Sequence, residues 1–224
     1  MLKKEAVSEA LFNVLNRLMG VKNLANHRLV GGTAYALQVG HRISVDIDLF
    51  SDTVSDYHLI EKEINQEFGT DAKLVHYIRS PLGRGISYLI GGIKTDLLDW
   101  NRTFHFPVET IEGIRMAGKT EIMAMKLDIL TGPPEFVRYE KKDFIDLSFM
   151  LLDYSLEEML ALYRGINPDM SDPERLVLEA LQLAELADKK PNPKMLRPLD
   201  WQEAKNIIQT SVLRFLDEKT KDSD

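Results

Sequence analysis

The sequence contains no cysteine among its 224 residues. This absence excludes disulfide scaffolds, zinc sites built from thiolates, and enzymes that use a thiol nucleophile. The sequence also lacks any apolar run of the roughly 18–20 residues that would cross a bilayer. Its first ten residues, MLKKEAVSEA, mix acidic and polar residues with apolar ones, unlike a secretory signal. We therefore expect a cytoplasmic protein without a membrane segment.

Positive charge is scarce in the second half of the chain. Lys and Arg number 28 against 35 Asp and Glu, which gives a formal net charge of −7. Residues 1–104 contain 12 residues of each sign, whereas residues 105–224 contain 16 basic and 23 acidic residues. This balance disfavours a generally basic nucleic-acid-binding domain. With 44% hydrophobic and 28% charged residues, the composition is that of a folded globular protein.

The hydrophobic periodicity changes near residue 115. Before that point the pattern predicts strands and helices in alternation. The predicted strands are 28–30, 43–50, 73–78, 85–90 and 93–98, and the predicted helices are 4–18, 33–39 and 56–68. After that point the pattern is helical throughout, with predicted helices at 119–130, 141–152, 156–164, 173–186 and 201–216. The sequence therefore predicts an α+β fold with an α/β domain at 1–114 and a helical domain at 115–224.

Two carboxylates, Asp46 and Asp48, lie two residues apart in the predicted strand 43–50. Residues at this spacing project from the same side of a strand. The apolar residues between and around them are then expected to face the core: Val45, Ile47 and Leu49. Two neighbouring carboxylates repel unless a cation lies between them, and Mg²⁺ or Mn²⁺ held together with substrate phosphates satisfies both. The alternative is an exposed strand face whose acids point at water.

A glycine pair precedes this strand, in the sequence Gly31-Gly32-Thr33. Glycine allows the backbone to approach a ligand closely, and a helix that begins here offers free N–H groups to phosphate. Thr33 is equally suited to be a simple helix N-cap. Together with the two aspartates, the glycine pair indicates a phosphate-binding turn beside a metal site.

A third carboxylate is expected from a neighbouring strand, and the predicted strand 93–98 offers Asp96 and the adjacent Asp99. These two residues are three apart, so they project from opposite faces. We favour Asp96 because it lies within the strand, whereas Asp99 lies nearer to its end.

Lys126 interrupts the apolar stripe of the predicted helix 119–130. A lysine at such a position is costly unless its ammonium group is paired or extends to water. Asp143 and Asp146 lie three residues apart on the next helix and border its buried stripe, so they are plausible partners. The alternatives are a lysine that reaches a bound triphosphate, an interhelix ion pair without a chemical role, and a lysine that extends into solvent.

These residues together resemble a known family. Gly31-Gly32-Thr33-Ala34, followed by His41-Arg42-Ile43-Ser44-Val45-Asp46-Ile47-Asp48, is similar to the opening motif of the AbiEii/AbiGii-type nucleotidyltransferase toxins, members of the polymerase-β-like superfamily. Glu121 with Lys126 resembles the third motif, with Glu in place of the more usual Asp. Lys142-Asp143 with Asp146 resembles the fourth. The general superfamily has Gly-Ser where this chain has Gly32-Thr33, and the resemblance covers roughly residues 27–151.

The resemblance implies a mixed β-sheet flanked by helices and followed by a helical domain. It implies transfer of a nucleoside monophosphate from an NTP such as ATP, GTP or CTP to an acceptor hydroxyl, with a tRNA 3′ end as the favoured acceptor. It further implies a toxin of a type IV toxin–antitoxin or abortive-infection system, with a cognate antitoxin as partner. The alternatives are a non-catalytic nucleotide- or partner-binding module and transfer to a protein or small-molecule hydroxyl.

The resemblance also implies roles for individual residues. Asp46, Asp48 and Asp96 are the metal-binding and catalytic carboxylates, and Lys126 and Asp146 are further catalytic residues. The implied nucleotide-binding residues are Gly31, Gly32, Thr33, Arg42, Ser44, Lys126 and Asp143.

Overall fold

The structure is a computed structural model that describes residues 1–132 and 139–221. It divides into two compact units, Met1–Ile122 and Met123–Asp224. The boundary falls within helix α4 (Lys119–Thr131), later in the chain than the change in periodicity near residue 115. The domain boundary after residue 114 stays a prediction.

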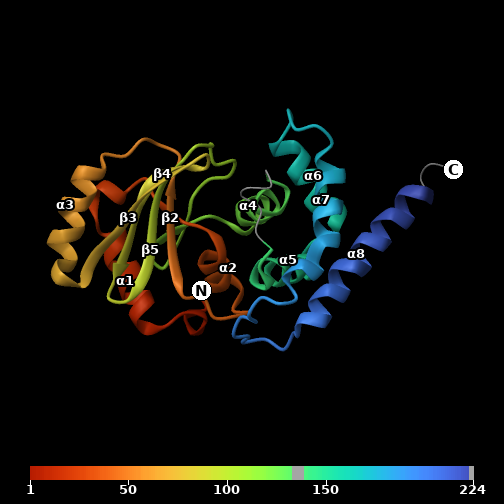
Figure 1. Cartoon of the computed structure of the whole chain (residues 1–224), viewed down its shortest axis with the longest axis horizontal. Coiled ribbons are helices and arrows are strands. Elements are labelled where there is room, and N and C mark those ends of the chain that lie inside the picture. Colours follow the sequence, from red (N-terminus) through yellow and green to blue (C-terminus); the bar gives the residue numbers. More distant parts are fainter. Residues whose placement is uncertain (133–138, 222–224) are drawn as a thin grey trace. The chain divides into compact units, whose positions relative to one another are not determined.

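A seven-stranded sheet forms the centre of the first unit, with the strand order β3-β4-β5-β2-β1-β7-β6. The strands are β1 (Arg28–Leu29), β2 (Asp46–Ser51), β3 (Ala72–Ser80), β4 (Gly83–Ile90), β5 (Ile93–Trp100), β6 (Glu109–Ile111) and β7 (Ile114–Met116) (Figure 1). Strand β2 runs parallel to β5, and β1 runs parallel to β7, whereas the other neighbours are antiparallel. The mixed sheet flanked by helices is therefore confirmed. Strands β6 and β7 were not predicted.

Helices connect and flank these strands. They are η1 (Lys4–Ala6), α1 (Glu9–Met19), η2 (Lys22–Leu24), α2 (Gly31–Val39), α3 (Tyr57–Phe68) and η3 (Gly69–Asp71). The prediction of one helix over 4–18 is wrong at its start, because the Ser8 side chain accepts the Leu11 N–H and begins α1 afresh. Helix α3 begins in the same way, with Asp56 accepting the N–H groups of His58 and Leu59.

Strand β2 shows where alternation predicted the core correctly and where it failed. Ile47 and Leu49 are fully buried, as predicted. Val45 is 70% exposed, so the prediction that it faces the core is wrong. The strand begins only at Asp46, because the preceding segment is held by other contacts, among them the hydrogen bond from the Ser44 N–H to the Ala6 carbonyl. The alternating pattern therefore extends further along the sequence than the strand does.

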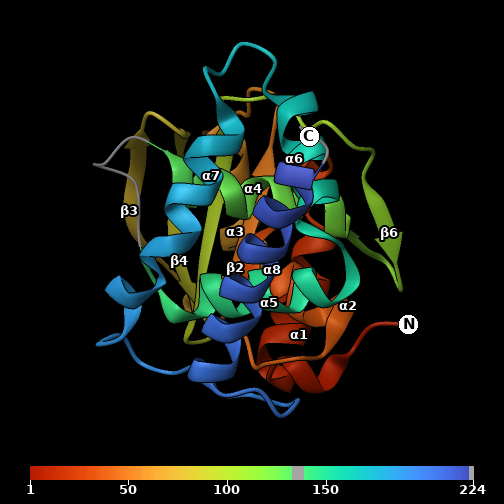
Figure 2. The ribbon, with the colours of Figure 1, turned by 90° about the vertical axis from the view of Figure 1, so that its right-hand side faces the viewer.

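The second unit is helical, as predicted. After α4 it contains α5 (Lys141–Asp153), α6 (Leu156–Ile166), α7 (Pro173–Gln182), η4 (Leu183–Ala187) and α8 (Trp201–Lys221). Helix α8 packs on α5, α6 and α7 (Figure 2). The predicted helix 173–186 is α-helical only to Gln182 and continues as a 3₁₀ helix. None of the helices in the described residues has the length and apolar character needed to cross a membrane.

Candidate active site

Parallel pairing of β2 with β5 brings the predicted carboxylates together. In this register Asp46 lies opposite Lys94, and Asp48 lies opposite Asp96. Register partners on neighbouring strands project from the same face of a sheet, so these four charged side chains form one array. We call this array the carboxylate face. It contains Asp96 and excludes Asp99, because Asp99 projects from the opposite face of β5.

Both carboxylate oxygens of Asp96 are engaged by neighbouring side chains. The Ser87 hydroxyl, in register on β4, donates to Asp96 Oδ1 at 2.5 Å. The Lys94 ammonium lies 2.6 Å from Asp96 Oδ2. Ser87 is buried, whereas the Lys94 side chain is 56% exposed, so the first contact is enclosed and the second is open to solvent.

The ammonium group of Lys94 places a positive charge on the carboxylate face. Partial burial lowers the pKa of Lys94, but the hydrogen bond to Asp96 and the negative charges of Asp96, Asp48 and Asp46 outweigh it and raise the pKa above its usual value. Lys94 therefore stays protonated and offsets part of the repulsion among the three acids.

The glycine turn contacts Asp48 directly. Gly31 has φ +66°, a conformation that favours glycine, and a Cβ at this position would lie 3.3 Å from Asp48 Oδ2. The Val30 N–H also donates to the Asp48 carbonyl at 2.9 Å. Helix α2 begins at Gly31, and its N-cap residue Val30 supplies no side-chain cap. Thr33 is therefore not the N-cap, and the backbone of Gly31 and Gly32 opens the helix beside Asp48.

Three predicted nucleotide-binding side chains are buried in this structure: Thr33, Arg42 and Ser44. The Thr33 hydroxyl donates to the Asp46 carbonyl at 2.5 Å and lies 2.8 Å from the Ser44 hydroxyl. The Arg42 guanidinium donates to the Ile43 carbonyl at 3.1 Å. These contacts join the start of α2 to the segment that leads into β2, so the side chains fix the position of Asp46.

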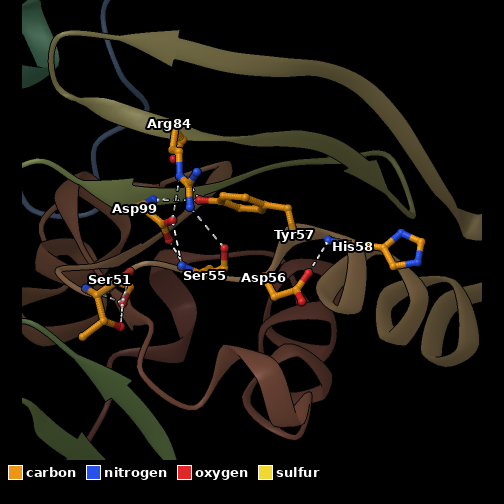
Figure 3. Close-up of polar contacts among 8 residues, drawn as sticks. Ser51, Ser55, Asp56, Tyr57, His58, Arg84 and Asp99 are labelled. Carbon is orange, nitrogen blue, oxygen red and sulfur yellow. Dashed lines mark hydrogen bonds and ion pairs between the residues drawn. The ribbon is translucent and has the colours of Figure 1, made fainter.

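Asp99 belongs to a separate cluster at the β2–α3 loop (Figure 3). Ser55 donates its hydroxyl to Asp99 Oδ1 at 2.5 Å and its N–H to Oδ2 at 2.9 Å, and Arg84 Nε lies 3.3 Å from Oδ2. The Tyr57 hydroxyl accepts the Asp99 N–H and donates to the Arg84 carbonyl. Burial, followed by the charge of Asp99, raises the pKa of Tyr57. The cluster attaches the loop to β4 and β5, and no spacing in the sequence predicted it.

In the second unit, Lys126 is enclosed with two carboxylates. Its ammonium lies 2.5 Å from Asp143 Oδ1 and 2.7 Å from Asp146 Oδ2, and all three side chains are at most 3% exposed. We call these residues the buried lysine cluster. The structure thus contains the predicted ion pairs, and the alternative of a lysine extending into solvent is wrong. A role for these three residues in nucleotide binding or catalysis stays a prediction.

Glu121, the acid of the segment that resembles the third motif, is buried in the first unit. Its Oε2 accepts the N–H groups of His105 and Phe106 at 2.9 and 2.8 Å. Burial raises the pKa of Glu121 above its usual value. Its position indicates that Glu121 stabilises the chain segment at residues 105–106.

The donor set of the carboxylate face suits a hard divalent cation. Its side-chain ligands are all oxygens, which Mg²⁺ and Mn²⁺ prefer, and the missing Cβ of Gly31 leaves room beside Asp48. Across residues 1–132 and 139–221, however, no three His, Asp or Glu side chains are arranged so that they could already hold a metal ion. Both oxygens of Asp96 are engaged instead by Ser87 and Lys94. Metal binding by Asp46, Asp48 and Asp96 therefore stays a prediction.

Comparison with solved structures gives the class of fold. The fold is similar to two crystal structures from Helicobacter pylori, one titled as a "putative nucleotidyltransferase" (TM-score 0.55, 20% identity, 97% of this chain and 99% of that chain) and one of JHP933 (TM-score 0.54, 23% identity, 97% and 96%). The fold is thus that of nucleotidyltransferase-like proteins.

Sequence comparison finds a family model that matches part of the chain. Residues 14–88 match the model described as "Nucleotidyl transferase AbiEii toxin, Type IV TA system". This match confirms the resemblance to the AbiEii nucleotidyltransferase toxin family over these residues. The matched segment contains Gly31, Asp46 and Asp48. An uncharacterised protein of Aquifex aeolicus, aq_aa25, is 26% identical over 230 residues, covering 96% of this chain and 98% of its own length.

Proposed function

We propose that this protein is a divalent-metal-dependent nucleotidyltransferase that moves a nucleoside monophosphate from an NTP to an acceptor hydroxyl and releases pyrophosphate. The observation that carries the proposal is the register of Asp48 against Asp96, inside a nucleotidyltransferase-like fold, with Gly31 placed so that a Cβ there would lie 3.3 Å from Asp48 Oδ2. Carboxylates that face one another beside a helix N-terminus combine the two features that a metal-bound triphosphate requires.

Asp46, Asp48 and Asp96 are the proposed ligands of Mg²⁺ or Mn²⁺. Such ions, when bound, stabilise the charge that develops on the attacking and leaving oxygens of phosphoryl transfer. The N–H groups of Gly31 and Gly32 face the same end of α2 and are suited to bind the phosphates of the NTP. In the same proposal the buried side chains of Thr33, Arg42 and Ser44 contribute by shaping this turn.

Asp96 is proposed to have a second role in the transfer reaction, besides binding metal. The acceptor oxygen forms a bond to the α-phosphorus, the bond from that phosphorus to the bridging oxygen breaks, and pyrophosphate leaves. The acceptor hydroxyl must lose its proton in this step, and Asp96 is proposed to orient the hydroxyl and accept that proton. Its contact with Ser87 keeps the carboxylate in place on the carboxylate face.

Two roles are open to Lys126. The family motif implies that Lys126 neutralises charge on the leaving pyrophosphate, with Asp143 contacting the nucleotide and Asp146 orienting the lysine. The bonds in the structure support a second role, in which Lys126 joins α4 to α5 through both carboxylates. A stability measurement separates these roles, as set out in the Discussion.

The proposed biological role follows from the family description. A type IV toxin–antitoxin family implies a toxin with a cognate antitoxin, and we propose an RNA acceptor, with the tRNA 3′ end first. A non-catalytic nucleotide- or partner-binding module of the same fold is the competing function. Transfer to a protein or small-molecule hydroxyl is the competing reaction.

A label-transfer assay tests the proposal. The purified protein is incubated with each α-³²P-labelled NTP and Mg²⁺, in parallel with total tRNA and with a cell lysate, and the labelled product is identified on denaturing gels. We expect label on tRNA, and none with the Asp48→Asn variant or with EDTA. Label on protein or on a small molecule would show that the acceptor is not tRNA. Intact nucleotide binding without transfer to any acceptor would favour the binding module.

A further inference from the structure

Lys94 is a basic residue on the carboxylate face, and it is not one of the proposed metal ligands. It lies opposite Asp46 in the register, and its ammonium contacts Asp96 at 2.6 Å. The charges of Asp46, Asp48 and Asp96 all act on it. The same face that suits a divalent cation therefore already carries one cation of the chain itself.

We propose that Lys94 is an internal counter-ion that competes with the divalent cation for Asp96, so that Lys94 sets the affinity of the carboxylate face for metal. This inference rests on the proposed function, because it takes the three carboxylates as the metal ligands. Lys94 is a positioning residue in this account, since it acts through Asp96.

Charge and geometry both support competition. Three carboxylates repel one another strongly without a cation, and the ammonium reduces their combined charge from −3 to −2. A metal ion that uses an oxygen of Asp96 must replace a charged hydrogen-bond donor at that carboxylate. Ser87 holds Oδ1, so the oxygen that Lys94 contacts, Oδ2, is the one released when the lysine leaves.

The exposure of Lys94 makes its release feasible. The side chain is 56% exposed and sits at the end of a flexible stem, so the ammonium is able to leave Asp96 and be hydrated at little cost. The buried neighbours of Lys94 along β5, Thr95 and Leu97, project from the opposite face, so its departure does not disturb their packing. The metal-free face is thus stabilised by a cation that exchanges with solvent.

Mn²⁺ binding tests the inference without reference to catalysis. The free ion is measured by the amplitude of its EPR signal during titration of the wild-type protein and of Lys94→Met. We expect Lys94→Met to bind Mn²⁺ about tenfold more tightly, as removal of one contacting unit charge predicts. Lys94→Arg keeps the charge and should remain within about twofold of the wild type.

Lys73→Met is the matched control. Lys73 lies on β3 in the register row that runs through Leu89 to Lys94, so the variant removes the same charge two strands away. We expect its Mn²⁺ affinity to change by less than about twofold, since an exposed charge at this distance is screened. Equal gains in Lys73→Met and Lys94→Met would overturn the inference, because they would reflect net charge alone.

Two further results would also overturn it: unchanged or weaker Mn²⁺ binding by Lys94→Met, and no measurable binding by either the wild type or the variant. Lys94→Gln, a polar replacement, repeats the measurement in case the methionine disturbs the fold.

Failure of this inference is distinguishable from failure of the proposed function. Label transfer with no effect of Lys94 on Mn²⁺ affinity would refute only the inference, whereas the expected Mn²⁺ affinities without transfer to any acceptor would refute only the proposed function.

Discussion

The carboxylate face and the buried lysine cluster use the same chemical groups in opposite ways. In each, a lysine ammonium contacts aspartate oxygens at nearly equal distances, 2.6 Å on the face and 2.5 and 2.7 Å in the cluster. The lysine on the face is 56% exposed, whereas the lysine in the cluster is 3% exposed. Distance alone therefore does not distinguish an exchangeable ion pair from a structural one.

Burial decides what each ion pair contributes. An exposed pair is worth at most about 1 kcal/mol, so its lysine changes partners easily. A buried pair has lost its hydration, and removal of one partner leaves an uncompensated charge in the interior. Burial is therefore consistent with the ligand binding proposed for the carboxylate face and favours the stabilising role of the two proposed for Lys126.

The largest expected effect separates the two regions by activity. Asp48→Asn should lower label transfer by at least about 10³-fold, since it removes a proposed metal ligand. The melting temperature should stay near that of the wild type, because Asp48 is partly exposed and the change reduces repulsion. Initial rates and thermal unfolding are measured on the same preparation. Full activity of Asp48→Asn would remove the basis for the metal assignment.

The next largest effect separates them by stability. Lys126→Ala leaves Asp143 and Asp146 buried without their cation, so the free energy of unfolding in urea should fall by about 3–5 kcal/mol. Its control is the triple variant Lys126→Met, Asp143→Asn and Asp146→Asn, which removes all three charges and should recover most of the loss. If Lys126→Ala were as stable as the wild type but inactive, the catalytic role of Lys126 would be favoured over the structural one.

His27, which lies outside both regions, shows how burial affects a basic side chain that has no hydrogen-bond partner among the described residues. His27 is 1% exposed, and neither of its ring nitrogens has a hydrogen-bond partner among the described residues. Burial lowers the pKa of His27 from 6.5 to about 4, with the charge of Asp99 opposing this effect and that of Arg115 adding to it. Without a carboxylate in contact, this side chain stays neutral in the folded protein.

The sign of the pH effect follows from that lowered pKa. Between about pH 6.5 and 4 the unfolded chain binds a proton at His27 that the folded chain does not. Stability is therefore full above pH 6.5 and is lost as the pH falls toward 4, by up to about 3 kcal/mol. The stability of His27→Leu, followed by urea unfolding across this range, should depend less on pH. An unchanged pH dependence in this variant would contradict the prediction.

The smallest effect compares two of the glycines with positive φ, one that lies beside a carboxylate and one that has open space around it. Gly31→Ala and Gly92→Ala each place an alanine at positive φ, +66° and +83°, and each should cost about 1–2 kcal/mol of stability. Only at Gly31 does the added Cβ meet a carboxylate, Asp48, whereas the Cβ at Gly92 meets nothing within 4 Å. Mn²⁺ affinity and transfer should therefore fall in Gly31→Ala alone. Equal losses in both variants would argue against a role for the turn.

Sequence periodicity predicted the fold where burial is one-sided. Ile47 and Leu49 are buried and the helical second unit is present, because regular alternation and helical stripes record which face meets the core. Strands β6 and β7, three residues each, are too short to produce a periodic signal. Val45 continues the alternating pattern but lies outside β2, so the pattern placed it in the core wrongly.

The site was predictable only in part, for a related reason. The spacing of Asp46 and Asp48 and the isolated lysine at 126 are local signals. The contact of Ser87 with Asp96 and the cluster around Asp99 depend on strand register and loop docking, which spacing along the chain does not record. Lys94 and Asp96 are two residues apart and project from the same face of β5. The sequence of the strand alone does not indicate that their side chains form an ion pair.

The most direct measurement is a crystal structure with Mn²⁺ and a non-hydrolysable NTP analogue, with the ion located by its anomalous signal. The account predicts a peak within about 2.0–2.4 Å of carboxylate oxygens of Asp46 and Asp48, with Asp96 released from the Lys94 ammonium. Mn²⁺ bound elsewhere, with these carboxylates remote from both ion and nucleotide, would contradict it.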